Sequence, residues 1–326
     1  MDKRERLQAT LSGQAVDRVA VALWRHFPVD DQDPARLAAA TVEWQQQYDF
    51  DLVKVTPASS FCLKDWGADD QWTGNPEGTR DYTNRIVRRP DDWAALKMLD
   101  PRQGHLGEQL KALSLIRSGL GEGTPFIQTV FSPLSQARNL VGAAELPVHV
   151  RQHPQALKAA LEVITETTVR FVQAARATGI DGIFYALQMA TTRVFSEAEY
   201  REFGEPYDRR VLAAADGLWL NLAHLHGEDV MFDLAAGYGT PVTNWHDTET
   251  PPTLAEGLEK VRGAVCGGLR QWETMVRGTP EQVQAEAEAA FEQTGGRRLI
   301  LGTGCVTPTT APRANLRAAR EAVEHH

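Results

Sequence analysis

Two histidines one residue apart are the strongest chemical signal in this sequence. His224 and His226 lie at the end of the largely apolar run 218–226, and Gly227 follows them. Successive side chains of a β-strand point to opposite faces, so residues two apart share a face. The spacing predicts a strand with both imidazoles on one side of its carboxyl end. There the pair can bind a metal ion, or it can cap the strand and hydrogen-bond to neighbouring loops.

Further polar side chains follow other apolar runs. They are Arg25, His26, Ser132, Gln188, His246, Asp247 and Cys305. The carboxyl ends of parallel strands meet at one face of an α/β protein, and ligands bind at that face. We therefore expect these residues to line a single mouth. Because a structural protein has no reason to gather unusual polar groups there, we predict an enzyme that acts on a small molecule.

The composition is typical of a globular protein. The chain has 326 residues, of which 42% are apolar and 24% charged, and its net charge is −9. That charge argues against nucleic acid as a partner, because no basic stripe is available. No apolar run approaches the ~20 residues that cross a membrane, and the charged start 1–6 lacks the apolar core of a signal peptide. We expect a cytoplasmic protein without membrane contact.

The three cysteines are far apart in the sequence. Cys62, Cys266 and Cys305 cannot form a disulfide framework, and so few cysteines suit a reducing compartment. Cys266 lies in the middle of an apolar run, where we expect it to be a small buried hydrophobe. Cys305 follows the last such run, so its thiol is free for chemistry.

Eight apolar runs alternate with helical patterns and would position these residues. The predicted strands are 19–24, 52–55, 125–131, 179–187, 218–227, 241–245, 263–269 and 298–305; the predicted helices include 34–48, 106–118, 154–178, 197–215, 280–293 and 311–324. Residues 60–105 are irregular, with at most a hairpin arm at 85–90, and we expect them to form a lid or rim. The alternation predicts an α/β fold, a (β/α)8 TIM barrel, as one domain over residues 1–326.

The sequence resembles the uroporphyrinogen decarboxylase superfamily over nearly its whole length. The segments that carry the resemblance are 17–21, 179–183 with 203–207, 224–227, and 301–310 with 315–316. The resemblance implies a barrel that supports two chemistries. One is the cofactor-free decarboxylation of uroporphyrinogen, and the other is zinc-dependent methyl transfer from corrinoid proteins to thiols.

The segments that would bind a porphyrin precursor differ from those of the decarboxylases. These enzymes have an arginine-rich segment after the first strand, where this chain has Arg25 followed by Asp30 and Asp31. Residues 56–61 lack the aspartate that follows the second strand, and 302–304 read Gly-Thr-Gly in place of Gly-His-Gly. A substrate with eight carboxylates would find too little positive charge in this mouth.

The methyltransferase branch fits better, with one change. Its members have His-x-Cys on the fifth strand and a cysteine after the eighth, and these bind one zinc ion. Here His224 and Cys305 match, while His226 replaces the first cysteine. The resemblance implies one Zn²⁺ per chain on two imidazoles and one thiolate, with a fourth position open. A zinc ion with one thiolate ligand has a formal charge of +1, whereas one with two thiolates is neutral. The zinc ion here should therefore be a stronger Lewis acid, and a reaction through zinc-bound hydroxide is more plausible than in the relatives.

Roles for the other residues of the mouth follow from their chemistry. His246 can be a general acid or base with Asp247 as its carboxylate neighbour, although Asp247 can equally cap the next helix. His26 is a second catalytic candidate. Arg25 can bind a substrate carboxylate or pair with an aspartate of the rim.

Three other polar residues are candidates for binding the substrate. Gln188 can orient it or can satisfy a loop, and Ser132 can contribute a hydroxyl. Tyr207 can reach the mouth, but a tyrosine in a helix after a proline usually packs.

Three hypotheses about function follow. The first is a zinc enzyme that activates a thiol or thioether sulfur for methyl or alkyl transfer or cleavage, with a corrinoid protein as a possible partner. The second is a metal-free decarboxylase or lyase for a smaller acid, in which Arg25 anchors the carboxylate and His26 or His246 donates a proton. The third is a non-catalytic protein that binds a corrinoid or a tetrapyrrole.

Overall fold

Eight parallel strands form the centre of the computed structural model, in the order β1-β10-β9-β8-β7-β6-β5-β2. Their bounds are Ala20–Val21 (β1), Val53–Val55 (β2), Phe126–Phe131 (β5), Gly182–Leu187 (β6), Leu222–Leu225 (β7), Val242–Asn244 (β8), Ala264–Leu269 (β9) and Leu299–Thr303 (β10). The two outer strands of this order also meet, because the Asp51 amide donates to the Val21 carbonyl at 2.9 Å. The predicted (β/α)8 barrel is therefore confirmed. The structure describes residues 1–324, so His325 and His326 lie outside the described residues.

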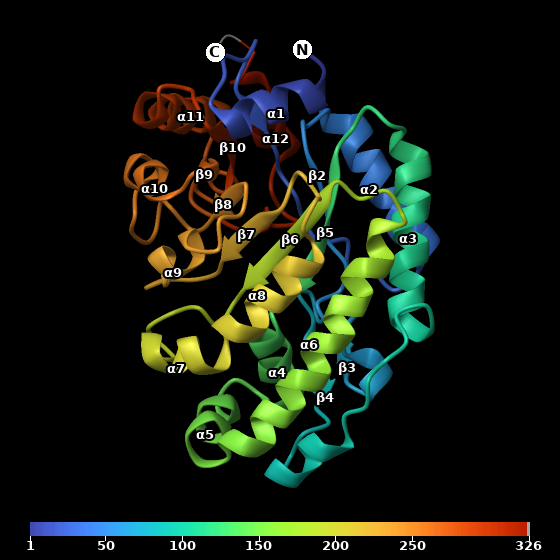
Figure 1. Cartoon of the computed structure of the whole chain (residues 1–326). Helices are drawn as coiled ribbons and strands as arrows, with labels where there is room; N and C mark the ends of the chain where they lie inside the picture. The colour runs from blue at the N-terminus through green and yellow to red at the C-terminus, as the bar shows by residue number, and fades with distance from the viewer. Residues whose placement is uncertain (325–326) are drawn as a thin grey trace.

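Helices surround the strands (Figure 1). The longer ones are Lys3–Ser12 (α1), Pro34–Tyr48 (α2), Gly104–Leu120 (α3), Pro154–Arg176 (α6), Pro280–Thr294 (α11) and Arg313–Glu321 (α12); the shorter ones include Phe232–Ala236 (α9) and Leu254–Lys260 (α10). Helix α2 begins as predicted, since the Asp33 carboxylate accepts from the amides of Ala35 and Arg36. Within residues 1–324, every helix is too short or too polar to cross a bilayer.

Two predictions about helices are wrong. Residues 197–215 form two helices, Glu197–Phe203 (α7) and Glu205–Ala214 (α8), because Pro206 has no amide hydrogen with which to continue the first one. Residues 133–152, for which no element was predicted, contain Pro133–Val141 (α4) and Glu145–Gln152 (α5). Helix α4 starts at Pro133 directly after a strand, and Ser132 caps it.

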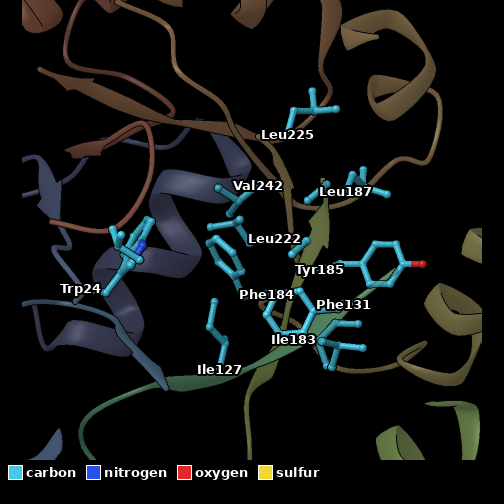
Figure 2. Packing of buried hydrophobic residues seen from close by; sticks show 14 of the residues in the cluster. Trp24, Ile127, Phe131, Ile183, Phe184, Tyr185, Leu187, Leu222, Leu225 and Val242 are labelled. Atoms are coloured by element: carbon cyan, nitrogen blue, oxygen red, sulfur yellow. The ribbon is translucent and has the colours of Figure 1, made fainter. Parts of the chain in front are cut away.

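The alternation of side chains on β6 separates the inside of the barrel from its helical layer. Figure 2 shows Phe184 on the side of Trp24, whereas Tyr185 points away. The Phe184 and Trp24 ring centroids are 5.5 Å apart. Every residue of β6 and β7 is buried, as is usual for parallel strands covered on both faces. The inner face of these strands therefore forms the floor beneath the mouth of the barrel.

The irregular segment 60–105 contains short elements, and the loop between two of them contributes Glu77 and Thr79 to the lining of a pocket at the mouth. The elements are two 3-10 helices, Lys64–Trp66 (η1) and Pro90–Ala95 (η2), and the antiparallel strands Asp69–Gln71 (β3) and Asp81–Asn84 (β4). The hairpin arm lies at 81–84, so its predicted position at 85–90 is wrong.

The loop 72–80 between β3 and β4 is tied to the far side of the barrel. The Thr309 amide donates to the Pro76 carbonyl at 2.7 Å, and the Gln271 side chain donates to the Glu77 carboxylate at 3.0 Å. Gly78 has a φ of +78°, and a Cβ there would lie 2.5 Å from that of His26. A glycine is therefore required where the loop meets the mouth.

Candidate metal centre

The structure brings the three predicted metal ligands together. His224 is in β7, His226 directly follows it, and Cys305 follows β10. The Cys305 Sγ is 3.8 Å from Nε2 of His224 and 3.6 Å from Nδ1 of His226. One ligand atom from each residue lies within 4.8 Å of the other two. Strands far apart in sequence therefore place two nitrogens and one sulfur at the same point of the mouth.

These separations match those of a tetrahedral zinc site. With Zn–S bonds of about 2.3 Å and Zn–N bonds of about 2.05 Å, a tetrahedral angle puts sulfur and nitrogen roughly 3.6 Å apart. The observed distances of 3.6 and 3.8 Å between Sγ and the two nitrogens are close to this value. The donor set also suits zinc, which binds imidazole and thiolate.

Asn244, which the sequence analysis missed, fixes the orientation of His224. Its side-chain amide donates to the carbonyls of Cys266 at 2.8 Å and Thr303 at 3.1 Å. Its Oδ1 atom must therefore face His224, where it lies 2.7 Å from Nδ1. Because this oxygen can only accept, Nδ1 of His224 is the protonated nitrogen and Nε2 presents its lone pair to Cys305.

Burial keeps both imidazoles in the form that binds metal. It lowers the pKa of His224 well below its usual range, and the neighbouring His226 and His246 lower it further. Burial also lowers the pKa of His226. Both rings are therefore neutral near pH 7, and only the neutral ring has a free lone pair for a metal. The Phe184 ring stacks on His224 with the two centroids 4.9 Å apart.

A pocket opens beside the three ligands. Its lining is Trp24, His26, Lys54, Thr56, Pro57, Glu77, Thr79, Thr129, Phe131, Phe184, Ala186, Gln188, His224, His226, Cys305 and Val306. Two predicted site residues besides the ligands, His26 and Gln188, are among them. Burial, with the charges of Lys54 and Arg80, lowers the pKa of His26 to about 3, so its ring is neutral.

Arg25 lies next to the pocket, but its guanidinium is not part of the lining. It stacks on Trp44, 4.9 Å from the ring centroid, and on Phe27 at 5.2 Å. The predicted pairing with an aspartate of the rim is wrong, because Asp30 binds Arg36 and Asp31 binds Arg80. The predicted role as a carboxylate anchor has no geometric support, since Arg25 is not among the residues that line the pocket.

Ser132 and Tyr207 lie outside the pocket. Ser132 is the N-cap of α4, and its Oγ is 2.7 Å from that of Ser135. Tyr207 lies in α8 in the outer layer, where burial raises its pKa and Glu162 is among the nearest charges. The Ser132 hydroxyl caps a helix and neither residue lines the pocket, so both substrate contacts stay predictions without support in this geometry.

His246 and Asp247 have different surroundings. The His246 ring is 5.3 Å from that of His226, centroid to centroid, and its Nδ1 is 3.3 Å from a Glu249 oxygen. The Asp247 carboxylate instead accepts from the Gly268 amide at 3.1 Å, and burial raises its pKa to about 7. The carboxylate next to His246 is therefore Glu249 rather than Asp247. Asp247 is not a helix cap either, because Thr253 caps α10.

Lys54 is a second residue of the pocket that sequence analysis missed. It lies in β2 and is buried, with its Nζ 4.4 Å from the Phe184 ring centroid. Burial lowers the pKa of Lys54 to about 7, while Cys305 acts in the opposite direction. The available signal was a single lysine within the apolar run 52–55.

Comparisons with known proteins identify the family of this chain. The family model described as "Uroporphyrinogen decarboxylase (URO-D)" matches residues 2–326. A curated relative, the methylcobamide:CoM methyltransferase MtaA of Methanosarcina barkeri, is 23% identical, and the match covers 97% of this chain and 95% of the relative. A uroporphyrinogen decarboxylase of Rhodococcus opacus (strain B4) is 30% identical, over 56% of this chain and 51% of that protein.

A solved structure has the same fold. A methyltransferase from Methanosarcina mazei superposes with a TM-score of 0.87 at 19% identity, covering 99% of this chain and 98% of the other. At this identity the superposition establishes the fold. The relatives named here are enzymes of two kinds, methyltransferases and decarboxylases.

Proposed function

We propose a function from the premise that this chain belongs to the uroporphyrinogen decarboxylase (URO-D) family. The proposal is a zinc-dependent enzyme that activates a thiol or thioether sulfur for the transfer of a methyl or other alkyl group. The observation that carries it is the meeting of His224, His226 and Cys305, with separations between nitrogen and sulfur of 3.6 and 3.8 Å. The methyltransferases among the relatives support this branch of the family.

The three residues would hold the zinc ion, and Asn244 would keep His224 in the correct tautomer. A zinc ion bound there would supply a Lewis acid that favours the deprotonated form of a substrate sulfur. His246 lies outside the lining of the pocket, but its ring is 5.3 Å from that of His226, and it would exchange a proton with a ligand bound to the zinc ion. Its buried Nε2 has no hydrogen-bond partner within residues 1–324, so that nitrogen is free for such a role.

The pocket is better suited to a small substrate than to a porphyrin precursor. Lys54 is the one lysine in its lining, and no arginine of residues 1–324 belongs to that lining. A substrate with many carboxylates needs several cations or amide donors to replace the water around them. The methyl donor would be a corrinoid on a separate protein, as the name of the MtaA relative suggests.

The proposal is tested by methyl transfer to a small thiol. Zinc-loaded protein is incubated with methylcobalamin and a thiol, and the methyl thioether is quantified by mass spectrometry. The methyl group moves to sulfur, the thiol proton goes to solvent, and both electrons of the broken Co–C bond remain on cobalt. We expect product from the wild type, and none after chelation or in Cys305→Ala.

Two further measurements, of CO2 release and of visible absorbance, separate the alternatives. A metal-free carboxy-lyase would instead release CO2 from an organic acid, and this activity would survive chelators. A corrinoid- or tetrapyrrole-binding protein would bind its ligand with a visible absorbance band and turn over neither substrate. Either result, without thiol methylation, would overturn the proposal.

A further inference from the structure

Lys54 and Arg6 are the lysine and arginine side chains that are buried within residues 1–324, and of the two only Arg6 has carboxylate partners. Arg6 and Arg18 both bind the buried Asp51 at 2.7 Å, and Arg80 binds Asp31 at 3.1 Å. Around Lys54 the neighbours are aromatic: Nζ is 4.4 Å from the Phe184 ring centroid and 6.0 Å from that of Trp24. Within residues 1–324, no carboxylate forms an ion pair with it.

A buried ammonium is costly without a nearby anion, and the acidic group that acts on Lys54, Cys305, is itself a proposed zinc ligand. Contacts with aromatic faces return only part of the hydration that a buried ammonium loses. Lys54 also lines the pocket, so the pocket gives a ligand access to it. The missing counter-ion can therefore be supplied by whatever the pocket binds.

The distance from Lys54 to the proposed zinc site suits a compact ligand. Phe184 contacts both parts: Nζ of Lys54 is 4.4 Å from its ring centroid, and the His224 ring is 4.9 Å from it. The two groups cannot be farther apart than these distances taken together. A molecule with a sulfur at one end and an anion a few bonds away can reach both.

We propose that Lys54 is a specificity-determining residue that binds an anionic group, such as a carboxylate, of the sulfur substrate. The inference rests on the proposed function, because it places the substrate sulfur at His224, His226 and Cys305. It also replaces Arg25 as the anchor for a carboxylate, since Arg25 stacks on Trp44 and Phe27 outside the pocket lining.

The test compares thiols that differ only in terminal charge. Isothermal titration of zinc-loaded protein with 3-mercaptopropionate, 3-mercaptopropan-1-ol and 3-aminopropane-1-thiol gives three dissociation constants. For the wild type we expect the carboxylate to bind about 10- to 100-fold more tightly than the alcohol, and the amine most weakly. In Lys54→Met this preference should disappear, while the affinity for the alcohol is unchanged.

Two controls make the result specific. Arg25→Met removes a guanidinium that lies near the pocket but outside its lining, and it should keep the full preference for the carboxylate. Lys54→Arg keeps a positive charge in the pocket and should keep part of that preference. Lys54→Met should fold, because it places an apolar chain among aromatic rings and removes an unpaired charge. Its melting temperature should equal or exceed that of the wild type; if it did not fold, Lys54→Gln would be used in the same titration.

The outcomes separate the inference from the function on which it rests. Equal binding of the three thiols by the wild type, or an unchanged preference in Lys54→Met, would overturn the role of Lys54 and leave the zinc proposal standing. If zinc-loaded wild type bound none of the thiols, the proposed function would fail, and the inference would fail with it.

Discussion

Two buried polar clusters lie on opposite sides of the same strand. On the outer side of β6, the hydroxyls of Tyr185, Tyr200 and Tyr238 all donate to the carboxylate of Asp208, at 2.6, 2.8 and 2.8 Å. On the inner side, Phe184 stacks on His224, whose Nε2 atom lies close to the ligand atoms of His226 and Cys305. The neighbours Phe184 and Tyr185 belong to different clusters because strand side chains alternate, as Figure 2 shows.

The difference between the clusters is whether their donors and acceptors are paired with one another. In the outer cluster each of the three hydroxyls has an acceptor and both oxygens of Asp208 have donors, and these hydrogen bonds tie β6 to α7 and α8. In the inner cluster two neutral rings direct nitrogens at a sulfur, and none of the three residues has a carboxylate. A closed cluster contributes stability, whereas an open one is available for chemistry. The predictions below test this distinction.

The largest expected effect is on stability and comes from the closed cluster. Asp208→Ala leaves three buried hydroxyls without their acceptor, which should lower the free energy of unfolding by about 3–5 kcal/mol. Urea unfolding followed by circular dichroism measures this loss. The zinc content of the folded fraction should stay the same. A loss below about 1 kcal/mol would show that the cluster is not structural.

The pH dependence of stability should reveal the same carboxyl. Burial, opposed by the three tyrosine hydroxyls, raises the pKa of Asp208 to about 6. Between the unfolded pKa of about 3.9 and this value, the folded state binds the proton more tightly than the unfolded state. The contribution of Asp208 therefore falls as pH rises through this window, by roughly 3 kcal/mol in total.

Asp208→Asn cannot titrate and removes this term. Subtracting its unfolding free energy from that of the wild type, at several pH values, should give a difference that declines from pH 4 to 6 and is flat above. A difference independent of pH would contradict the raised pKa.

A smaller effect is expected from the residue that orients the open cluster. Asn244→Ala should weaken zinc binding by about 10- to 100-fold, because His224 loses the acceptor that fixes its tautomer. Competition with a chromophoric chelator measures the affinity. Asn221→Ala is the matched control, since Asn221 accepts from the Ile183 amide away from the three ligands. Equal losses in both variants would point to a general loss of packing.

The smallest effect is expected at Tyr207. Tyr207→Phe removes a hydroxyl in the outer layer and should change the unfolding free energy by no more than about 0.5 kcal/mol. Zinc affinity and thiol methylation should equal those of the wild type. A fall in methylation with stability retained would restore the substrate contact that the sequence predicted.

Features that follow from the local spacing of residues could be predicted from the sequence. The alternation of apolar runs and helical patterns gave the barrel, and the two-residue spacing of His224 and His226 put both rings on one face. Cys305 follows the last strand, and the ends of parallel strands meet, so its place in the mouth could also be predicted. Its assignment as a ligand of the same ion as the two histidines came from the resemblance to the methyltransferases of the family.

Features that depend on packing could not be predicted. Lys54 lies in a strand only three residues long, where the sequence does not show which side chain faces inward. Arg25 follows a strand, as expected, but the Trp44 and Phe27 rings hold it. Ser132 also has the expected position, but its hydroxyl caps α4. A polar residue at a strand end can thus serve a helix or a ring instead of a ligand.

The most direct test of the central claim is the zinc content of the purified protein. Wild type and the variants His224→Ala, His226→Ala and Cys305→Ala are saturated with zinc, dialysed without chelator and analysed by atomic emission, with circular dichroism as the check of folding. The account predicts about one zinc per chain in the wild type and far less in each folded variant. Wild-type protein that retains no zinc, or variants that retain as much as the wild type, would contradict it.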